Sequence, residues 1–388
     1  MNGFNDNKLP DFGDDVEVIY MQDELEDLVD EEETESFPGA DEIETSDLDS
    51  DIIFDAEVVD LSKLSFCGHS SSVFCGDLSP DGEIVATGGG DDIAYIWRSS
   101  NGEVLLECTG HKDSVTEVAF NYNGQYVATG DMGGLIQVWN VSEKLLVWCF
   151  EGDDLEWLTW HHAANVLIAG SQSGDVFVWQ IPQGNSKVLG SHGSTSTCGK
   201  LLQDGKRIVV GYGDGNLKLW DIKEASVIWQ IPDLVDITSI ETNSDGSLLA
   251  IAPVSKVIKV SDGKVIGDYC TTEKPDIEAI LFEDELGILV TGCLSGQISV
   301  WDVGKKTLRH KTEIGFTITC FAWGTKGILV VGTTNGSIYI YDVRSGTILR
   351  TITGHKDDIL SMKVAKDKSF VLTTSDDCSA KVFNINSN

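Results

Sequence analysis

Apolar and polar residues alternate in short runs along most of this chain. From about residue 61 onward, runs of Val, Ile, Leu and Thr are separated by Gly, Asp and Asn, and apolar residues at helical spacing are scarce. Alternation with a period of two is typical of half-buried β-strands, and glycine and aspartate between such runs are typical of tight turns. The pattern therefore predicts an all-β fold.

One alternating segment recurs eight times. Its copies read DDIAYIW, GGLIQVW, SGDVFVW, DGNLKLW, SKVIKVS, SGQISVW, NGSIYIY and DCSAKVF. A period of about 40 residues built from short strands indicates a β-propeller with one blade per repeat, so eight blades are predicted. The residues that close the core of each copy follow one another at intervals of 40 to 42 residues, and they are Trp97, Trp139, Trp179, Trp220, Val260, Trp301, Tyr341 and Phe383.

Histidines mark the beginning of four repeats. His69, His111, His192 and His355 each lie 28 residues before the closing residue of their repeat, and glycine precedes three of them. A Trp-Asp pair ends two of the repeats. Together with the period, these features resemble the WD40 repeat. The resemblance covers residues 65–388 and implies a WD40 propeller of four-stranded blades.

The WD40 resemblance also implies a hydrogen-bonded set in each blade, made of a histidine, a hydroxyl, a turn aspartate and the closing tryptophan. Blade one has all four members, as His69, Thr87, Asp91 and Trp97. Blade five keeps little beyond the strand alternation. The other sets are partial: His111 and Trp139 in blade two, where Gly133 replaces the turn aspartate; His192, Asp214 and Trp220 in blade four; His355, Thr373, Asp377 and Phe383 in blade eight.

A spare strand precedes the first repeat. The segment VVDLSKLSF at 58–66 alternates like a strand, whereas the chain ends five residues after Phe383, before blade eight could form its outermost strand. We therefore expect residues 58–66 to complete blade eight. Closure by the two ends of the chain hides the sheet edges and holds the ring together.

The N-terminal segment has a different composition. Residues 1–60 contain 23 Asp and Glu and a single Lys, so they cannot bury enough apolar surface to offset their conformational entropy and self-repulsion. We expect a disordered acidic tail over residues 1–50 and the propeller over 51–388. The tail has two interpretations: it keeps the protein in solution without a specific partner, or it recruits a basic ligand.

The overall charge narrows the choice of partners. The 388 residues include 27 Lys and Arg and 63 Asp and Glu, a net charge of −36, which disfavours direct contact with nucleic acid or anionic membranes. A basic protein segment is the expected partner of a monomeric propeller. Because no N-terminal signal or long apolar run is found, we expect a cytoplasmic protein, with the nucleus as an alternative location.

No motif predicts catalysis, a cofactor or a metal. The glycine clusters stand at strand ends with no helix after them to present amides to a phosphate. His161 and His162 are adjacent in a strand-like segment, so their side chains point in opposite directions. The nine cysteines are scattered without metal-ligand spacing and are expected to be reduced. We therefore expect a binding protein rather than an enzyme.

The loops that lead into the innermost strands predict a binding face. In a propeller these loops surround a funnel-shaped mouth, and carboxylates recur in them at equivalent places. Trp157 lies beside several of these acids and is expected to present its ring to a cation. Turns also favour Asp for local hydrogen bonds, so the acids have a purely structural interpretation as well. The predicted partner-binding acids are Asp113, Asp153, Asp154, Glu156, Asp236, Asp276, Asp357 and Asp358.

The amino-acid sequences of the blades resemble one family more closely than they resemble WD40 proteins in general. Five segments are similar to segments of the angio-associated migratory cell protein family. They read SVFCGDLSPDGEIVATGGGDDIAYIWR, GHKDSVTEVAF, VATGDMGGLIQVW, DLEWLTWH and LLQDGKRIVVGYGDGNLKLWD. The resemblance implies a dedicated chaperone, because fungal relatives hold the basic N-terminal segment of a large-subunit ribosomal protein on an acidic face. The alternative is a cytoplasmic signalling scaffold linked to cell migration, as animal members suggest.

Overall fold

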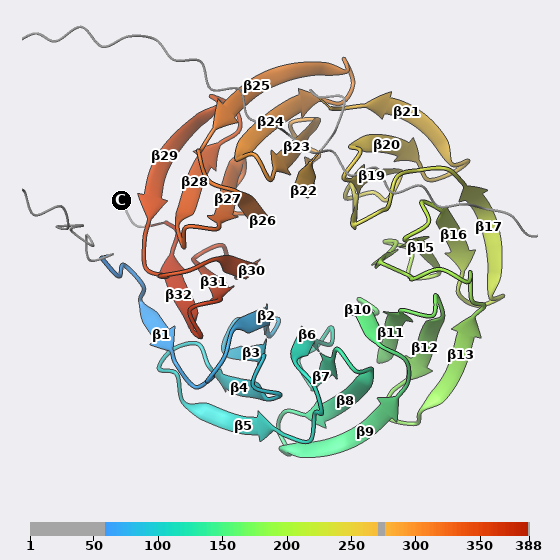
Figure 1. The fold of residues 1–388 in the computed structure, drawn as a ribbon, viewed down its shortest axis with the longest axis vertical. Coiled ribbons are helices and arrows are strands. Elements are labelled where there is room, and N and C mark those ends of the chain that lie inside the picture. Colours follow the sequence, from blue (N-terminus) through green and yellow to red (C-terminus); the bar gives the residue numbers. More distant parts are fainter. Residues whose placement is uncertain (1–58, 271–275, 387–388) are drawn as a thin grey trace, which may run out of the picture. The chain divides into compact units, whose positions relative to one another are not determined.

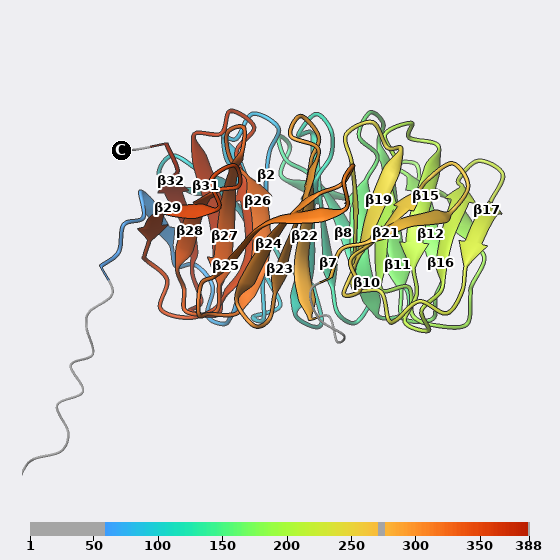
Figure 2. The same cartoon turned by 90° about the horizontal axis from the view of Figure 1, so that it is seen from above.

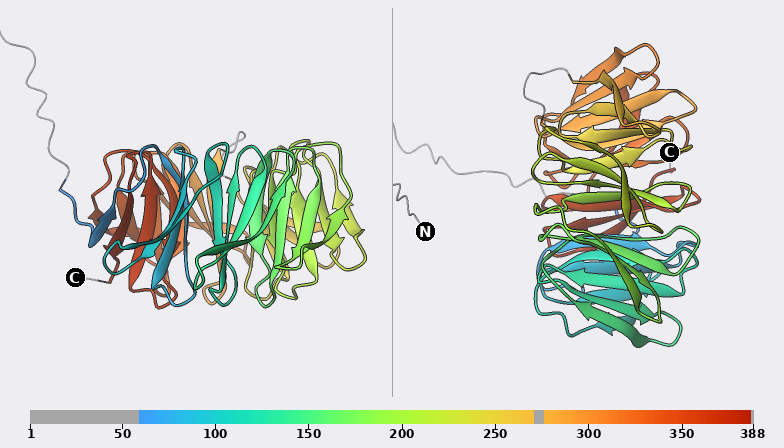
Figure 3. Two further views of the ribbon diagram at one scale, coloured as in Figure 1. Left: turned by 90° about the horizontal axis from the view of Figure 1, so that it is seen from below. Right: turned by 90° about the vertical axis from the view of Figure 1, so that its right-hand side faces the viewer.

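The computed structural model describes residues 59–270 and 276–386. Within these ranges the chain forms 32 strands in eight four-stranded antiparallel sheets. The sheets are arranged as blades around a central channel (Figure 1), and the side views show strand-connecting loops on both flat faces of the disc (Figures 2 and 3). The predicted eight-bladed propeller is therefore confirmed. The acidic segment 1–50 and the boundary at 51 lie outside the described residues.

Seven blades take their four strands in chain order from the channel outward, and blade eight takes its outer strand from the N-terminal part of the described chain. Blades one and two comprise β2 (Val73–Leu78), β3 (Ile84–Gly89), β4 (Ala94–Arg98), β5 (Val104–Cys108), β6 (Val115–Phe120), β7 (Tyr126–Asp131), β8 (Leu135–Asn140) and β9 (Leu145–Glu151). Blades three and four comprise β10 (Leu155–Trp160), β11 (Val166–Ser171), β12 (Val176–Gln180), β13 (Asn185–Leu189), β14 (Cys198–Leu201), β15 (Arg207–Gly211), β16 (Leu217–Asp221) and β17 (Ser226–Ile231).

The second half of the ring repeats this order. Blades five and six comprise β18 (Ser239–Thr242), β19 (Leu248–Ala252), β20 (Lys256–Lys259), β21 (Lys264–Asp268), β22 (Ile277–Glu283), β23 (Ile288–Cys293), β24 (Gln297–Asp302) and β25 (Thr307–Glu313). Blades seven and eight comprise β26 (Ile318–Trp323), β27 (Ile328–Thr333), β28 (Ile338–Asp342), β29 (Thr347–Ile352), β30 (Ile359–Val364), β31 (Phe370–Ser375) and β32 (Ala380–Asn384), with β1 (Leu64–Phe66) as the last outer strand.

The closing residues of the eight repeats lie in or beside the third strand of each blade. All eight are buried, and most belong to apolar clusters that join one blade to the next. Val260 follows the end of β20 directly, so blade five keeps the architecture although it has lost the tryptophan. Burial of these side chains between neighbouring blades is the main favourable term that holds the ring together.

Blade one contains the hydrogen-bonded set that its sequence predicts. The Trp97 indole N–H donates to Thr87 Oγ1 at 3.2 Å, and Thr87 Oγ1 lies 3.0 Å from His69 Nε2. His69 Nδ1 lies 2.9 Å from an Asp91 carboxylate oxygen. Burial lowers the pKa of His69 although Asp91 opposes this effect, so the imidazole is neutral and the hydrogen bonds run from Trp97 through Thr87 and His69 to Asp91.

Blade two completes the same set with a residue that the sequence analysis missed. His111 Nδ1 lies 3.1 Å from a carboxylate oxygen of Asp131, and His111 Nε2 lies 2.8 Å from Thr129 Oγ1. Asp131 is the last residue of β7 and precedes the expected position, Gly133, by two residues. Its other oxygen accepts a hydrogen bond from the Leu135 amide at 2.9 Å. The carboxylate is therefore present in blade two, supplied from the strand end instead of the turn.

The sets in blades eight and four differ from each other. In blade eight, His355 contacts Asp377 at 3.0 Å and Thr373 at 2.8 Å, and Phe383 takes the place of the tryptophan. In blade four, His192 contacts Asp214 at 2.8 Å. The hydroxyl there belongs to Tyr212, which accepts the indole hydrogen bond of Trp220 at 3.3 Å. Blade four is thus held by a related network with a different hydroxyl.

The N-terminal strand closes the ring in blade eight. β1 pairs antiparallel with β32, with Leu64 opposite Val382 and Phe66 opposite Ala380. This strand is shorter than the 58–66 segment expected from the sequence, but residues before it are also bound. The Lys63 amide donates to the Val382 carbonyl of β32 at 2.8 Å, and the Leu61 amide donates at 3.0 Å to the Thr353 carbonyl in the connection between β29 and β30. Blade eight is therefore built from both ends of the described chain (Figure 1).

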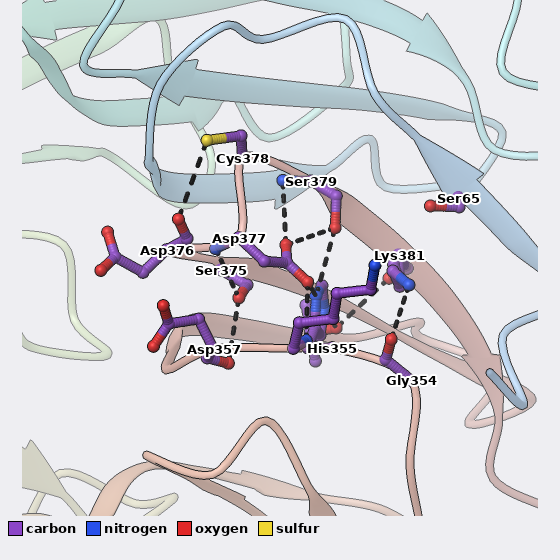
Figure 4. A network of polar contacts seen from close by, with 12 residues as sticks. Ser65, Gly354, His355, Asp357, Ser375, Asp376, Asp377, Cys378, Ser379 and Lys381 are labelled. Carbon is purple, nitrogen blue, oxygen red and sulfur yellow. Dashed lines mark hydrogen bonds and ion pairs between the residues drawn. The ribbon is translucent and has the colours of Figure 1, made fainter. Parts of the chain in front are cut away.

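A buried lysine reinforces this junction. Lys381 Nζ donates to the Gly354 carbonyl and lies 2.7 Å from an Asp60 carboxylate oxygen. Burial raises the pKa of Asp60, but hydrogen bonds from Lys381 and Ser62 outweigh this effect and hold the pKa below its ordinary value. Figure 4 shows Lys381 reaching Gly354 next to the His355 and Asp377 network. The junction thus pairs a charge of the first segment with a charge of the last blade.

Candidate partner-binding face

The predicted acids all lie on one face of the disc. In each blade, the loop before the innermost strand and the turn between the second and third strands are on the same side, because the strands run antiparallel from the channel outward. We call this side the funnel face. Its loops precede β2, β6, β10, β14, β18, β22, β26 and β30.

Most of the predicted acids are accessible on the funnel face. Glu156, Asp276 and Asp358 are half-buried, and the others are exposed. They belong to blades two, three, five, six and eight, so they surround the channel without forming a continuous ring. The exposed acids are Asp113, Asp153, Asp154, Asp236 and Asp357.

The acids of blades two and three border a cavity. Asp113, Asp154 and Glu156 line a hollow of about 320 Å³ together with apolar atoms of Met132 and Leu155. A space with carboxylates around aliphatic side chains suits a lysine or arginine, whose stem is apolar and whose end is cationic. The sequence predicted the acids of this hollow but not Met132, which lies in the turn between β7 and β8.

Backbone contacts hold the Asp153–Asp154 loop in place. The Gly152 amide donates to the Gly134 carbonyl at 3.1 Å, and the Gln172 amide donates to the Asp154 carbonyl at 2.9 Å. Gly134 has a positive φ of 86° and lies against the Asp153 carbonyl, so a side chain at this position would collide with the loop. Neither aspartate side chain has a hydrogen-bond or ion-pair partner among the residues that the structure describes. Both carboxylates are therefore free to meet a ligand.

Two carboxylates of the funnel face belong to β-bulges. Glu156 occupies the bulge at the beginning of β10, and Glu278 occupies the corresponding bulge of β22. Burial raises the pKa of both side chains, and the charge of Asp154 adds to the effect on Glu156. Sequence reasoning missed Glu278, although it lies 23 residues before Trp301 just as Glu156 lies 23 residues before Trp179.

Blade eight holds a second group of acids. Asp357 and Asp358 precede β30, and Asp376 lies in the nearby turn between β31 and β32 (Figure 4). Burial raises the pKa of Asp358, and the charges of Asp357 and Asp376 raise it further. Asp376 also accepts a hydrogen bond from the Ser72 hydroxyl of blade one. A cation near this group would relieve the repulsion among its carboxylates.

Two predicted acids lie farther around the ring. Asp236 is exposed in the loop before β18, and Asp276 directly precedes β22, where its carboxylate accepts a hydrogen bond from the Ser295 amide at 3.1 Å. In Figure 1, β22 lies across the channel from β6. A ligand that contacts blades two and three as well as Asp276 must therefore span the funnel face.

The structure corrects the expected position of Trp157. Its side chain is only 7% exposed and packs in the core between blades three and four, with Ile168, Val210 and Trp220. The indole N–H donates to the buried Ser196 hydroxyl at 3.0 Å. The residue after a bulge turns back toward the neighbouring blade, so Glu156 faces the channel mouth and Trp157 does not. The expectation that this ring meets a ligand cation is wrong.

We therefore expect Trp157→Ala to act on stability and not on binding directly. Truncation of a buried tryptophan should lower the free energy of unfolding by about 3–5 kcal/mol. Trp157→Phe, which leaves the Ser196 hydroxyl without its indole donor, should lower it by about 1–3 kcal/mol. Urea unfolding of the two variants measures both values. Unchanged stability with weakened ligand binding would instead restore the role as a binding residue.

The funnel face also exposes apolar side chains that the sequence analysis did not single out. Phe316 occupies in blade seven the loop position where blades three, six and eight place an aspartate, and it is 44% exposed. Met132 and Leu294 lie in turns between second and third strands. A ligand that alternates basic and apolar residues would match this mixture. The exposed apolar residues of the face are Phe74, Met132, Val235, Leu294 and Phe316.

Among residues 59–270 and 276–386, two loops of the funnel face carry a lysine. Lys112 lies 2.7 Å from a carboxylate oxygen of Glu151, which neutralises it within the protein. Lys356 is exposed and follows His355 in the loop before β30. The unpaired Asp153 and Asp154 carboxylates are therefore not neutralised by a lysine of their own loop, and they dominate the charge of blade three.

The described part of the chain shows no grouping that would hold a metal ion. In residues 59–270 and 276–386, no three His, Cys, Asp or Glu side chains are gathered as ligands. His161 and His162 do not point in opposite directions as expected: they follow the end of β10, and their rings stack at a centroid distance of 4.7 Å. The free thiols include Cys67, Cys75, Cys108, Cys149, Cys198, Cys293, Cys320 and Cys378. Across the same ranges, no helix with the length and apolarity needed to span a bilayer is present.

Comparison with known proteins gives consistent matches. The model of the "WD domain, G-beta repeat" family matches residues 61–98, 102–140, 185–221 and 346–384, which are the four repeats that contain the histidines. The "Angio-associated migratory cell protein" of Homo sapiens is 38% identical over 86% of this chain and 82% of its own length. The "Ribosome assembly protein SQT1" of Saccharomyces cerevisiae is 25% identical over 67% of this chain and 71% of its own length.

A solved structure has the same fold. The crystal structure of Sqt1 from Chaetomium thermophilum "bound to the N-terminus of the ribosomal protein L10" superposes with a TM-score of 0.76, at 19% sequence identity. The superposition covers 84% of this chain and 100% of the Sqt1 chain. At this identity the likeness establishes the propeller architecture.

Proposed function

This chain belongs to the angio-associated migratory cell protein family, and from that premise we propose that it is a binding propeller that captures the basic segment of a large-subunit ribosomal protein. The captured segment lies across the funnel face, where carboxylates meet its lysine and arginine side chains. The protein acts as a dedicated chaperone during ribosome assembly, in the cytoplasm or the nucleus. It works by binding and has no catalytic role.

The unpaired carboxylates of blade three carry this proposal. Asp153 and Asp154 are exposed on a loop whose backbone is fixed, and no cation of the described residues neutralises them. Purely structural turn aspartates accept hydrogen bonds from nearby amides, as Asp262 does from the Lys264 amide at 3.2 Å. Exposed carboxylates without such partners, beside a hollow of suitable size, favour an external cation as their partner.

The acidic character of the funnel face explains why a basic segment would be captured there. Basic segments of ribosomal proteins are made to contact RNA phosphates and attract nucleic acid wherever they are exposed. An acidic surface can occupy those cations and so prevent premature contacts with RNA. Because the attraction is partly solvated and mostly coulombic, the segment can be released again when phosphates compete for it.

Two similar proteins support this ligand class. The Chaetomium thermophilum propeller is described as bound to the N-terminus of a ribosomal protein, and the Saccharomyces cerevisiae relative is named a ribosome assembly protein. The name of the human relative refers instead to migratory cells. The alternative function is therefore a signalling scaffold whose ligand is the tail of a receptor or an adaptor.

Purification of the full-length protein from cells distinguishes these two functions. We expect one basic ribosomal protein of the large subunit to co-purify at near-stoichiometric yield, as judged by mass spectrometry. The D153K/D154K double variant, purified in parallel, should lose this partner because the carboxylates that hold it are reversed. Recovery of receptor tails or actin regulators without an enriched ribosomal protein would favour the scaffold and contradict the chaperone function.

A further inference from the structure

A second cavity lies inside the channel, next to the funnel-face hollow. It has a volume of about 480 Å³ and is lined by the innermost strands of blades eight, one, two and three, that is, by parts of β30, β2, β6 and β10. Thr116 lines both this channel cavity and the hollow between blades two and three. The two cavities therefore adjoin at Thr116.

The channel cavity contains three charged side chains from three blades. Asp77 of β2 is held on both sides: one oxygen accepts a hydrogen bond from the Phe120 amide at 2.8 Å, and the other lies 3.7 Å from Lys363 Nζ of β30. Glu117 of β6 lines the same cavity. Among residues 59–270 and 276–386, the Glu117 carboxyl group has no hydrogen-bond or ion-pair partner. The cavity thus holds one carboxylate with partners in the protein, one lysine, and the half-buried Glu117 carboxyl group, which has no such partner.

The position of Glu117 does not require an acid for the fold. Glu117 pairs with Gly130 near the end of β7. In blades five and eight the corresponding residues are Ser239 and Ser361, which pair with Ala252 and Thr374. In the five other blades the corresponding residues pair with a glycine. Those residues are small or apolar and pack against the next blade. Since cysteine and alanine fill this position elsewhere, the carboxyl group of Glu117 is a departure that packing does not explain. The residues of these five blades are Cys75, Trp157, Cys198, Ala279 and Cys320.

We propose that the channel cavity binds the ammonium or guanidinium group of one basic side chain of the captured segment, and that the Glu117 carboxylate is its partner. This inference rests on the proposed function and identifies where one cation of the segment is held. Thr116 lines both the channel cavity and the hollow that Asp113 and Asp154 border, so these acids lie near the cavity and attract the cation toward it.

Binding at this position releases a proton. Burial raises the pKa of Glu117 to about 8; the charge of Lys363 lowers it and that of Asp77 raises it. The free protein therefore carries Glu117 mostly as the neutral acid at pH 7. A ligand cation favours the carboxylate, so the carboxyl O–H bond breaks, its electron pair stays on the oxygen, and the proton passes to the buffer.

The other titratable groups that face Glu117 are few. Cys75 and Asp77 come from β2, and Lys363 comes from β30. Burial, Glu117 and Asp77 raise the pKa of Cys75 well above its ordinary value, so this thiol stays protonated. The lining residues of β10 are Leu158, Thr159 and Trp160, which do not titrate near neutral pH. Within the channel cavity, a proton released near pH 7 therefore comes from Glu117.

Calorimetric titration tests the inference with an acetylated, histidine-free, arginine-rich peptide. At pH 7, the binding enthalpy in phosphate and in Tris should differ by an amount that corresponds to release of close to one proton. Glu117→Gln should abolish this release. Asp113→Asn, the matched control, removes a negative charge from the funnel face and should weaken binding while leaving the proton release unchanged.

The pH dependence gives a second measurement. The affinity of the unaltered protein should rise up to about tenfold between pH 6.5 and 7.5 and level off above about pH 8, because only the ionised form of Glu117 pairs with the cation. The affinity of Glu117→Gln should change by less than about twofold. If the unaltered protein binds the peptide without releasing a proton, or if Glu117→Gln releases the same proton, the inference is wrong. If the unaltered protein does not bind at all, the proposed function itself fails.

Melting temperatures show that the variant is folded and test burial of the carboxyl group without any ligand. The pKa of Glu117 is raised by folding, so the stability it contributes is complete below about pH 4.5 and is lost as the pH rises toward about 8. Glutamine mimics the neutral acid at every pH. Glu117→Gln should therefore melt at a higher temperature than the unaltered protein at pH 8.5 and at a similar temperature at pH 5. Equal melting temperatures at both pH values would contradict the inference.

Discussion

Deletion of residues 1–66 should lower the melting temperature of the propeller by about 10 °C or more, whereas deletion of residues 1–55 should leave it unchanged. The longer deletion removes β1, the outer strand of blade eight, together with the Leu61 amide that binds the Thr353 carbonyl. The shorter deletion keeps every contact that the structure describes for the propeller. The difference between the two deletions therefore reports the contribution of ring closure.

The magnitude follows from what residues 59–66 bury. Phe66 is 5% exposed, and its ring stacks on the Trp97 indole at a centroid distance of 4.7 Å. Loss of a buried phenylalanine costs about 3–5 kcal/mol, and each lost backbone hydrogen bond costs about 1 kcal/mol more. In a domain of this size each kcal/mol corresponds to about 2–4 °C. The deletion also exposes the edge of β32 and leaves Lys381 without the Asp60 carboxylate.

Differential scanning calorimetry of the two deletion variants, at matched concentration, measures this difference. A single cooperative transition is expected for the shorter deletion, because the ring remains closed. Phe66→Ala in the full-length chain provides a control in which the strand is present but its main apolar contact is lost, and it should have an intermediate melting temperature. Equal melting temperatures for the two deletions would mean that β1 does not close the ring.

The repeat period was sufficient to predict the architecture because it reflects a physical unit. Each blade buries one closing residue against its neighbours, so eight such residues at regular spacing predicted eight blades, including blade five, where Val260 replaces the aromatic residue. The same period could have located Glu278, which occupies the same bulge as Glu156. Residues that recur at the same position of each repeat can thus be predicted from the sequence.

Residues whose side chains are redirected by local geometry were not predictable in this way. In a regular strand, successive side chains point to alternate faces of the sheet, so the face of each residue can be predicted from its position. A β-bulge adds one residue and reverses this assignment. Trp157 therefore faces the core while Glu156 faces the channel mouth. In blade two, Asp131 reaches His111 from the strand end although Gly133 occupies the expected position. The two cavities depend on how neighbouring blades approach one another, which no single repeat encodes.

Reversal of Asp153 and Asp154 to lysine should weaken binding of a basic segment by at least tenfold at low salt. The two substitutions change the charge of one loop by four units, and they turn attraction into repulsion at the rim of the hollow that Asp154 lines. A tenfold loss of affinity corresponds to about 1.4 kcal/mol. Each exposed charge pair contributes about 0.2–1 kcal/mol, so the loss of two such pairs together with the new repulsion is large enough to account for it. The melting temperature should stay nearly constant because both side chains are exposed.

A matched reversal on the opposite face separates local from general effects of charge. Glu83 and Glu143 are exposed in turns on the side of the disc opposite the funnel face, and the described residues offer neither side chain a partner. The Glu83→Lys and Glu143→Lys double variant has the same net charge as the D153K/D154K variant. It should bind the segment with nearly the affinity of the unaltered protein, because its changed charges lie more than a Debye length from the ligand at physiological salt.

Isothermal titration of the three proteins with a basic ribosomal-protein N-terminal peptide, at about 50 mM and about 500 mM salt, tests the binding face most directly. The account predicts tight binding by the unaltered protein and the opposite-face variant at low salt, weak binding by the D153K/D154K variant, and convergence of all three toward weak binding at high salt. Binding that is indifferent both to salt and to the reversal of Asp153 and Asp154, or absent altogether, would contradict it.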